Sequence, residues 1–86
     1  MDSTQRMTIM RERLQKALSP TVLDIIDDSE QHKGHEGSRD GAGHYTLKIL
    51  STLLDNKSRV DAHREIYALL ADLIPTEIHA LKIVVL

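Results

Sequence analysis

The segment HYTLKILS, residues 44–51, alternates between polar and apolar side chains along the chain. Its apolar members Tyr45, Leu47 and Ile49 would share one face of an extended backbone, because side chains alternate between the two faces of a strand. An alternation with a period of two residues predicts a β-strand that buries one face. We therefore expect a sheet in the fold, with this strand as one of its members.

Two other segments are predicted to be strands of the same sheet. Residues 21–27 are rich in β-branched side chains and lie between turn-forming residues, and residues 80–85 form the last apolar run. The first two strands are consecutive elements with no helix predicted between them, which suggests an antiparallel hairpin. Their connection, residues 28–43, is polar and glycine-rich, and it is far longer than the roughly two to five residues of an ordinary hairpin loop. Loops of that length in small domains are usually functional or disordered, so this segment is the most informative irregularity of the chain.

Two helices are predicted to cover one face of the sheet. Residues 8–18 carry apolar side chains at helical spacing, and the helix ends before a Ser-Pro pair. A second helix begins after an N-cap at Ser58 and continues to about residue 73. The order α-β-β-α-β predicts a single small α+β domain over residues 8–86, with a three-stranded sheet and both helices on one face. Residues 1–7 are expected to be a flexible N-terminus.

The composition argues against several classes of function. The chain has 86 residues, a formal net charge of −2 and no cysteine, so it has no disulfide and no thiolate metal ligand of its own. The acidic balance argues against binding nucleic acid through bulk electrostatics. No apolar run approaches the length of a membrane span, and the first residues lack the pattern of a signal peptide. We therefore expect a cytoplasmic protein without a membrane role.

Histidine is the residue type that offers chemistry, with five copies in the chain. His32 and His35 lie in the long loop, where an imidazole can bind a metal, although solvated loop residues are the simpler interpretation. His44 begins the strand predicted over residues 44–51, on its polar face, and is interpreted as exposed. His63 falls on an apolar helical stripe and is interpreted as structural. His79 precedes the last strand, where structural and functional roles are equally open.

No constellation of catalytic residues stands out in the sequence. Asp27 and Asp28 are adjacent, so in a strand their carboxylates would point to opposite faces instead of converging. The glycines of the long loop match neither a dinucleotide-binding pattern nor a phosphate-binding loop. We therefore expect a protein that binds partners and is not an enzyme.

Several motifs taken together resemble the BolA family. They occur in the expected order and at compatible spacing over about residues 8–86. They are Asp27-Asp28-Ser29 before a histidine-bearing loop, Gly43-His44-Tyr45 after it, Ser58-Arg59-Val60 followed by His63-Arg64 and Tyr67, and Ile78-His79-Ala80-Leu81. Because cysteine is absent, the chain resembles the members that carry histidine in the loop.

The resemblance implies an α-β-β-α-β fold akin to a type II KH domain. It also implies an iron–sulfur adaptor that binds a monothiol (CGFS-type) glutaredoxin and shares a [2Fe-2S] cluster with it, in cluster assembly, cluster transfer, or iron and redox regulation. In this family the C-terminal histidine, here His79, and a loop residue, here His32 or His35, contribute to the cluster. The glutaredoxin would supply a cysteine and bound glutathione, so the cluster would exist only in the complex. Alone, the chain would be a monomer or a weak dimer paired through an exposed sheet edge.

Two alternatives remain open from the sequence. Some BolA relatives are described as DNA-binding transcriptional regulators of stress or morphology responses, and in that role Arg59 and Arg64 would face phosphates. The acidic net charge weighs against this as a strong autonomous activity, as does the scarcity of aromatic side chains, which are Tyr45 and Tyr67 alone. The other alternative is a partner-binding domain with no metal role.

Overall fold

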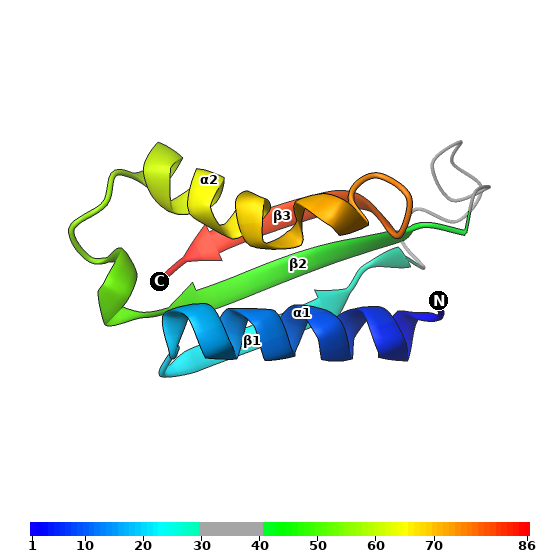
Figure 1. Ribbon diagram of the computed structural model, residues 1–86, viewed down its shortest axis with the longest axis horizontal. Coiled ribbons are helices and arrows are strands. Elements are labelled where there is room, and N and C mark those ends of the chain that lie inside the picture. Colours follow the sequence, from blue (N-terminus) through cyan, green and yellow to red (C-terminus); the bar gives the residue numbers. More distant parts are fainter. Residues whose placement is uncertain (30–40) are drawn as a thin grey trace.

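The computed structural model describes residues 1–29 and 41–86. The elements follow in the predicted order: α1 (Ser3–Leu18), β1 (Val22–Asp27), β2 (Gly43–Leu50), α2 (Arg59–Leu70) and β3 (Ile78–Val85), with short 3-10 helices at Thr52–Leu54 and Ala71–Leu73. Both helices lie on the same side of the sheet (Figure 1). The predicted α+β architecture is therefore confirmed. None of the helices in the described ranges has the length and apolar character needed to cross a bilayer.

The three strands form one sheet in which β2 is central. β1 pairs with β2 in antiparallel orientation, as the sequence predicts for consecutive strands, and β3 pairs with β2 in parallel orientation. Parallel neighbours need a crossover that returns the chain to the starting end of the sheet, and α2 provides it. The arrangement places the start of β2, the start of β3 and the end of β1 at the same end of the molecule.

The hydrophobic core lies between the sheet and the two helices. The side chains that β2 directs toward the helices are almost completely buried: Tyr45 is 2%, Leu47 0% and Ile49 0% exposed. Burial of one large apolar side chain contributes about 1.5–3 kcal/mol. The helices contribute Met10, Leu14 and Leu18 from α1, and Ala62, Ile66 and Leu70 from α2.

The buried face of α2 differs from the predicted stripe. The sequence pattern placed His63 on that stripe, but the imidazole is only half-buried and lies at its margin. The sheet instead contacts the aliphatic side chains of Ala62, Ile66 and Leu70, which recur every four residues. Two overlapping apolar stripes are present in this helix, and packing against the sheet selects the aliphatic one.

The first helix begins earlier than the sequence prediction. It starts at Ser3 and not at residue 8, so residues 3–7 are helical where a flexible segment was expected. A capping box explains the difference. The Asp2 carboxylate accepts a hydrogen bond from the Gln5 N–H, and the Gln5 amide oxygen accepts one from the Asp2 N–H, both at 2.9 Å. Two backbone donors that would otherwise lack partners at a helix start are thereby satisfied.

Candidate functional site

His79 occupies a β-bulge at the beginning of β3. Gly43 of β2 lies opposite Ile78, whereas the next residue of β2, His44, lies opposite Ala80. His79 is therefore an extra residue that has no counterpart on the neighbouring strand. Ile78 is completely buried and anchors the strand, while His79 is exposed. Because a bulge interrupts the regular alternation of side chains, it directs the imidazole differently from a regular strand position.

The imidazole of His44 packs beside that of His79. The centroids of the two rings are 5.1 Å apart and their planes are inclined by 52°. His44 is only 5% exposed, so its interpretation as an exposed strand residue is wrong. The alternation of polar and apolar residues correctly separates His44 from the core face of the strand. The alternation does not reveal the bulge that brings His79 against His44, because the bulge lies in β3 and does not change the pattern of β2.

Backbone hydrogen bonds fix His44 next to the end of β1. Its carbonyl accepts a hydrogen bond from the Asp28 N–H at 2.7 Å, and its N–H donates to the Ser29 hydroxyl oxygen at 3.2 Å. Ser29 is the last described residue before residues 30–40. His32 and His35, the two loop histidines predicted from the sequence, lie outside the described residues. Ser29 and Gly41, the described residues on either side of residues 30–40, therefore lie near the end of the sheet that carries His44 and His79.

Arg6 of α1 joins the chain segments that surround these histidines. Its Nη2 donates to the carbonyl of Gly41 at 2.6 Å, and its Nε donates to Oε1 of Glu77 at 3.1 Å. The carbonyl of Glu77 also accepts a hydrogen bond from the N–H of Gly43 at 2.9 Å. One guanidinium on a rigid helix therefore holds the approach to β2 and the approach to β3 together.

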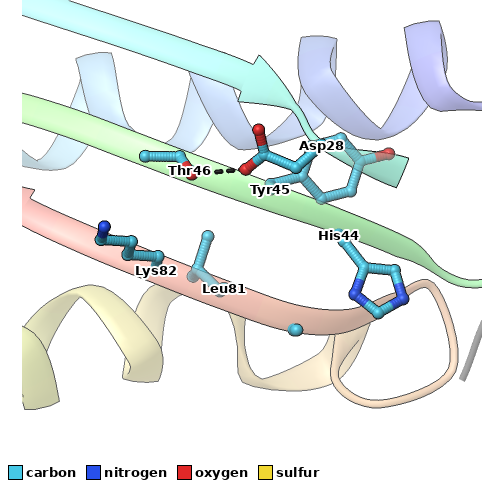
Figure 2. A pocket seen from close by; sticks show the side chains of 7 residues that line it. Asp28, His44, Tyr45, Thr46, Leu81 and Lys82 are labelled. Atoms are coloured by element: carbon cyan, nitrogen blue, oxygen red, sulfur yellow. Dashed lines mark hydrogen bonds between the residues drawn. The ribbon is translucent and has the colours of Figure 1, made fainter. Parts of the chain in front are cut away.

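A pocket with both polar and apolar lining residues lies beside His44 (Figure 2). It is lined by Asp28, His44, Tyr45, Thr46, Ala80, Leu81 and Lys82. The Thr46 hydroxyl donates a hydrogen bond to the Asp28 carboxylate, and Figure 2 shows both side chains on the same face of the strands as Lys82. This end of the sheet thus combines imidazole, carboxylate and ammonium groups.

The donor set at this end fits part of a metal site. His79 presents an exposed imidazole, which is the commonest metal-binding side chain in proteins. Within residues 1–29 and 41–86, no three histidine, aspartate or glutamate side chains lie close enough together to hold a metal ion by themselves. A complete coordination sphere would therefore need ligands from residues 30–40 or from a second protein.

The other candidate residues lie on α2, away from this end. Arg64 has a side chain that is 79% exposed, and its Nη1 is 4.0 Å from a carboxylate oxygen of Asp61. Arg59 is the first residue of α2 and lines a separate pocket together with His63. The structure therefore does not bring the two arginines or His63 into the His79 site.

Asp27 ends β1 beside the site and has a perturbed carboxyl group. Burial raises the pKa of Asp27, but hydrogen bonds from Ser29 and Ser3 and the positive charge of Arg6 lower it by more, so the pKa lies below its ordinary value. The ionised form of Asp27 is therefore favoured by folding.

We expect the Asp27→Asn substitution to reduce the free energy of unfolding at pH 7 by less than about 1 kcal/mol, because the carboxylate is largely exposed. A lowered folded-state pKa gives stability that is present above the unfolded value and is lost as the pH falls through the folded value. Urea denaturation at pH 7 and below pH 4 should show the difference between wild type and variant shrinking toward zero in acid. A difference that is constant over this range would contradict the assignment.

A family model described as "BolA-like protein" matches residues 14–86 of this chain. SufE-like protein 1, chloroplastic/mitochondrial, of Arabidopsis thaliana is 44% identical over 80 residues, which cover 87% of this chain and 22% of the relative. Protein BOLA1, chloroplastic, of the same plant is 43% identical over 82 residues, covering 92% of this chain and 51% of the relative. The chain therefore spans about a fifth and about half of the length of these two relatives.

The chain is also similar to a more distant relative and to a solved structure. The Escherichia coli (strain K12) protein named DNA-binding transcriptional regulator BolA is 30% identical over 74 residues, covering 86% of this chain and 68% of that protein. The structure of the BolA domain of SufE1 from Arabidopsis thaliana superposes with a TM-score of 0.81 at 40% identity. The match covers 99% of this chain and 92% of that one.

Proposed function

This chain belongs to the BolA family, and we propose that it is a non-catalytic iron–sulfur adaptor that binds a monothiol (CGFS-type) glutaredoxin and shares a [2Fe-2S] cluster with it. The observation that carries the proposal is the placement of His79. Its imidazole is exposed on a β-bulge and packs against the buried ring of His44, with centroids 5.1 Å apart. An imidazole held in this way is preorganised to coordinate a metal centre that a partner protein brings from outside.

In the proposed complex His79 would contribute one imidazole nitrogen, and His32 or His35 would contribute a second. The glutaredoxin would contribute its cysteine and the thiol of bound glutathione. Mixed imidazole and thiolate ligation gives a [2Fe-2S] cluster a higher reduction potential than thiolates alone. His44 would act as an outer partner that holds the ring of His79, in the way that outer groups commonly orient ligating imidazoles.

The composition of the chain supports an adaptor that acts in a complex. It contains no cysteine, and its described residues do not form a three-ligand group. Imidazoles alone would leave a cluster without the thiolate ligands that hold most iron–sulfur centres. The remaining ligands would therefore come from the partner.

The proposal is tested by mixing the chain with a cluster-loaded monothiol glutaredoxin. We expect the two proteins to co-elute in gel filtration and the visible circular dichroism of the cluster to change, because an imidazole of this chain would be a ligand of iron in the mixed complex. Apo-glutaredoxin serves as the control for binding that does not involve the cluster. Separate elution together with an unchanged spectrum would refute the proposal.

A second candidate function is regulation of transcription through DNA binding. It is favoured by the similarity to the Escherichia coli protein named DNA-binding transcriptional regulator BolA and by the exposure of Arg64 on α2. The nearby carboxylate of Asp61 and the net charge of −2 weaken the attraction to phosphates. DNA binding predicts a salt-sensitive gel shift that Arg59→Glu and Arg64→Glu abolish and His79→Ala leaves unchanged.

A further inference from the structure

The sheet edge formed by β3 carries backbone groups that no other strand in the described part of the chain covers. The N–H of Leu86 donates to the carbonyl of Ile49 in β2 at 2.8 Å. Successive residues of a strand direct their backbone groups to alternate sides. The N–H and C=O groups of Ile83 and Val85 therefore point away from β2. An edge of this kind is a template for an additional strand.

Part of this edge is already closed by a side chain. The hydroxyl of Tyr67 on α2 donates to the carbonyl of Leu81 at 2.7 Å. The opposite edge of the sheet has a similar contact, in which Nη1 of Arg11 donates to the carbonyl of Leu23 at 3.2 Å. Beyond Leu81, no side-chain hydrogen bond from the described residues closes this edge of β3, where Val84 and Val85 are half-buried and Ile83 is 8% exposed.

A pocket lies along this segment of β3. It is lined by Arg59 and His63 from α2 and by Ile83, Val84 and Val85 from β3. Figure 1 shows α2 running beside β3 over this part of the sheet. A helix and an open strand edge thus form the two walls of a groove, which is a recurring arrangement for the recognition of extended peptides.

The guanidinium of Arg59 gives the groove a positive charge. Arg59 and His63 are four residues apart on α2, so their side chains lie on the same face of the helix. Among the described residues no carboxylate lies within ion-pair distance of Arg59, whereas Glu65 is 3.1 Å from Lys57. The guanidinium of Arg59 is thus available to a carboxylate that enters the groove.

We propose that this groove binds an extended acidic segment of a partner protein, which adds a strand to the open edge of β3 and places a carboxylate against Arg59. Main-chain hydrogen bonds to Ile83 and Val85 would supply affinity, and the ion pair would select acidic sequences.

A second copy of this chain fits the groove poorly. Its own β3 has the sequence IHALKIVV, which contains a histidine and a lysine but no carboxylate to place against Arg59. Its β1 contains acidic residues, but pairing β1 of one copy with β3 of the next does not close and would build an open filament. Charge therefore favours a different, acidic partner.

This surface is separate from the proposed cluster site. Val85 lies at the far end of β3 from His79, about 20 Å away at roughly 3.3 Å per strand residue. The inference therefore does not depend on the proposed function. Peptide binding should persist in the His79→Ala variant, which makes the two failures distinguishable.

The test uses the full chain labelled with ¹⁵N and a synthetic peptide, acetyl-VTVEVTV-amide, followed by NMR titration. We expect saturable shifts at the backbone amides of Ile83, Val85 and Arg59. The same peptide with lysine in place of glutamate should bind at least about tenfold more weakly, as should the original peptide with the Arg59→Ala variant. In the Arg59→Glu variant the preference between the two peptides should reverse.

A pair of substitutions separates strand addition from simple charge attraction. Val85→Pro removes an N–H that faces away from β2, so it preserves the ladder of the sheet. Val85→Ala shortens the side chain and keeps this N–H. Peptide binding should be lost in the proline variant and retained in the alanine variant. Equal binding by both variants would overturn the proposal, as would shifts confined to other surfaces, self-association through β3 in analytical ultracentrifugation, or the same amide shifts produced by a DNA oligonucleotide in place of the peptide.

Discussion

Substitution of His79 by alanine is expected to abolish the cluster spectrum that the chain shares with a monothiol glutaredoxin, while the chain stays folded. The imidazole is exposed on a bulge, so its removal should change the free energy of unfolding by no more than about 0.5 kcal/mol. The proposed coordination, in contrast, would lose a direct ligand. Loss of an outer partner alone commonly weakens metal binding by about 10–100-fold, so removal of a ligand should weaken it further. Visible circular dichroism of the mixture and thermal unfolding of the isolated variant measure the two effects.

His63→Ala provides the matched control for this prediction. It also removes one imidazole, but from α2, where the side chain lines a different pocket with Arg59. The cluster spectrum should therefore be unchanged in this variant. If the two variants lose the spectrum equally, or if His79→Ala unfolds the chain, then His79 has no specific role as a ligand.

The second large effect is expected for the Gly43→Ala substitution, which should destabilise the fold by about 1–3 kcal/mol. The ring of Tyr45 lies over the backbone of Gly43, and a Cβ atom at position 43 would be 2.6 Å from the ring carbon Cζ. The ring cannot easily move away. It is only 2% exposed, and its hydroxyl is 3.0 Å from the hydroxyl oxygen of Ser3. Urea denaturation of wild type and variant measures the difference in the free energy of unfolding.

A double-mutant cycle identifies the ring of Tyr45 as the cause. In a Tyr45→Leu background the clash is absent, so the added destabilisation by Gly43→Ala should fall well below its value in the wild type. The same destabilisation in both backgrounds would show that Gly43 is needed for its backbone conformation or for the neighbouring bulge, and not because of the ring.

The architecture was predictable because each element has a strong local signal. The alternation around Tyr45, Leu47 and Ile49 defines the central strand and its buried face. Ser58 is the N-cap of α2, as predicted, and its hydroxyl accepts a hydrogen bond from the Asp61 N–H at 3.0 Å. These signals arise from neighbours in the sequence, so they can be read without knowledge of the tertiary structure.

The start of α1 was also readable in principle. The Asp2-x-x-Gln5 pattern has the form of a capping box. The buried apolar residues of α1 begin only at Met10. The hydrophobic pattern alone therefore does not reveal the first turn of the helix.

The geometry of the candidate site could not be predicted in this way. The pairing of His44 with His79 depends on the register between β2 and β3, which are separated in the chain by α2. A bulge adds one residue to one strand without altering the polarity of its neighbours. Sequence patterns therefore identified His79 as a candidate but could not show that His44 lies buried beside it.

In the proposed complex, histidines of this chain coordinate the cluster. Pulsed electron paramagnetic resonance of the reduced complex tests this coordination most directly, with ¹⁵N-histidine incorporated only into this chain and the glutaredoxin unlabelled. We expect ¹⁵N hyperfine couplings of directly coordinated imidazole, which disappear when the chain is prepared with ordinary histidine and are lost together with the shared cluster in the His79→Ala variant. A reduced cluster without any coupling to the labelled histidines would show that this chain supplies no histidine ligand.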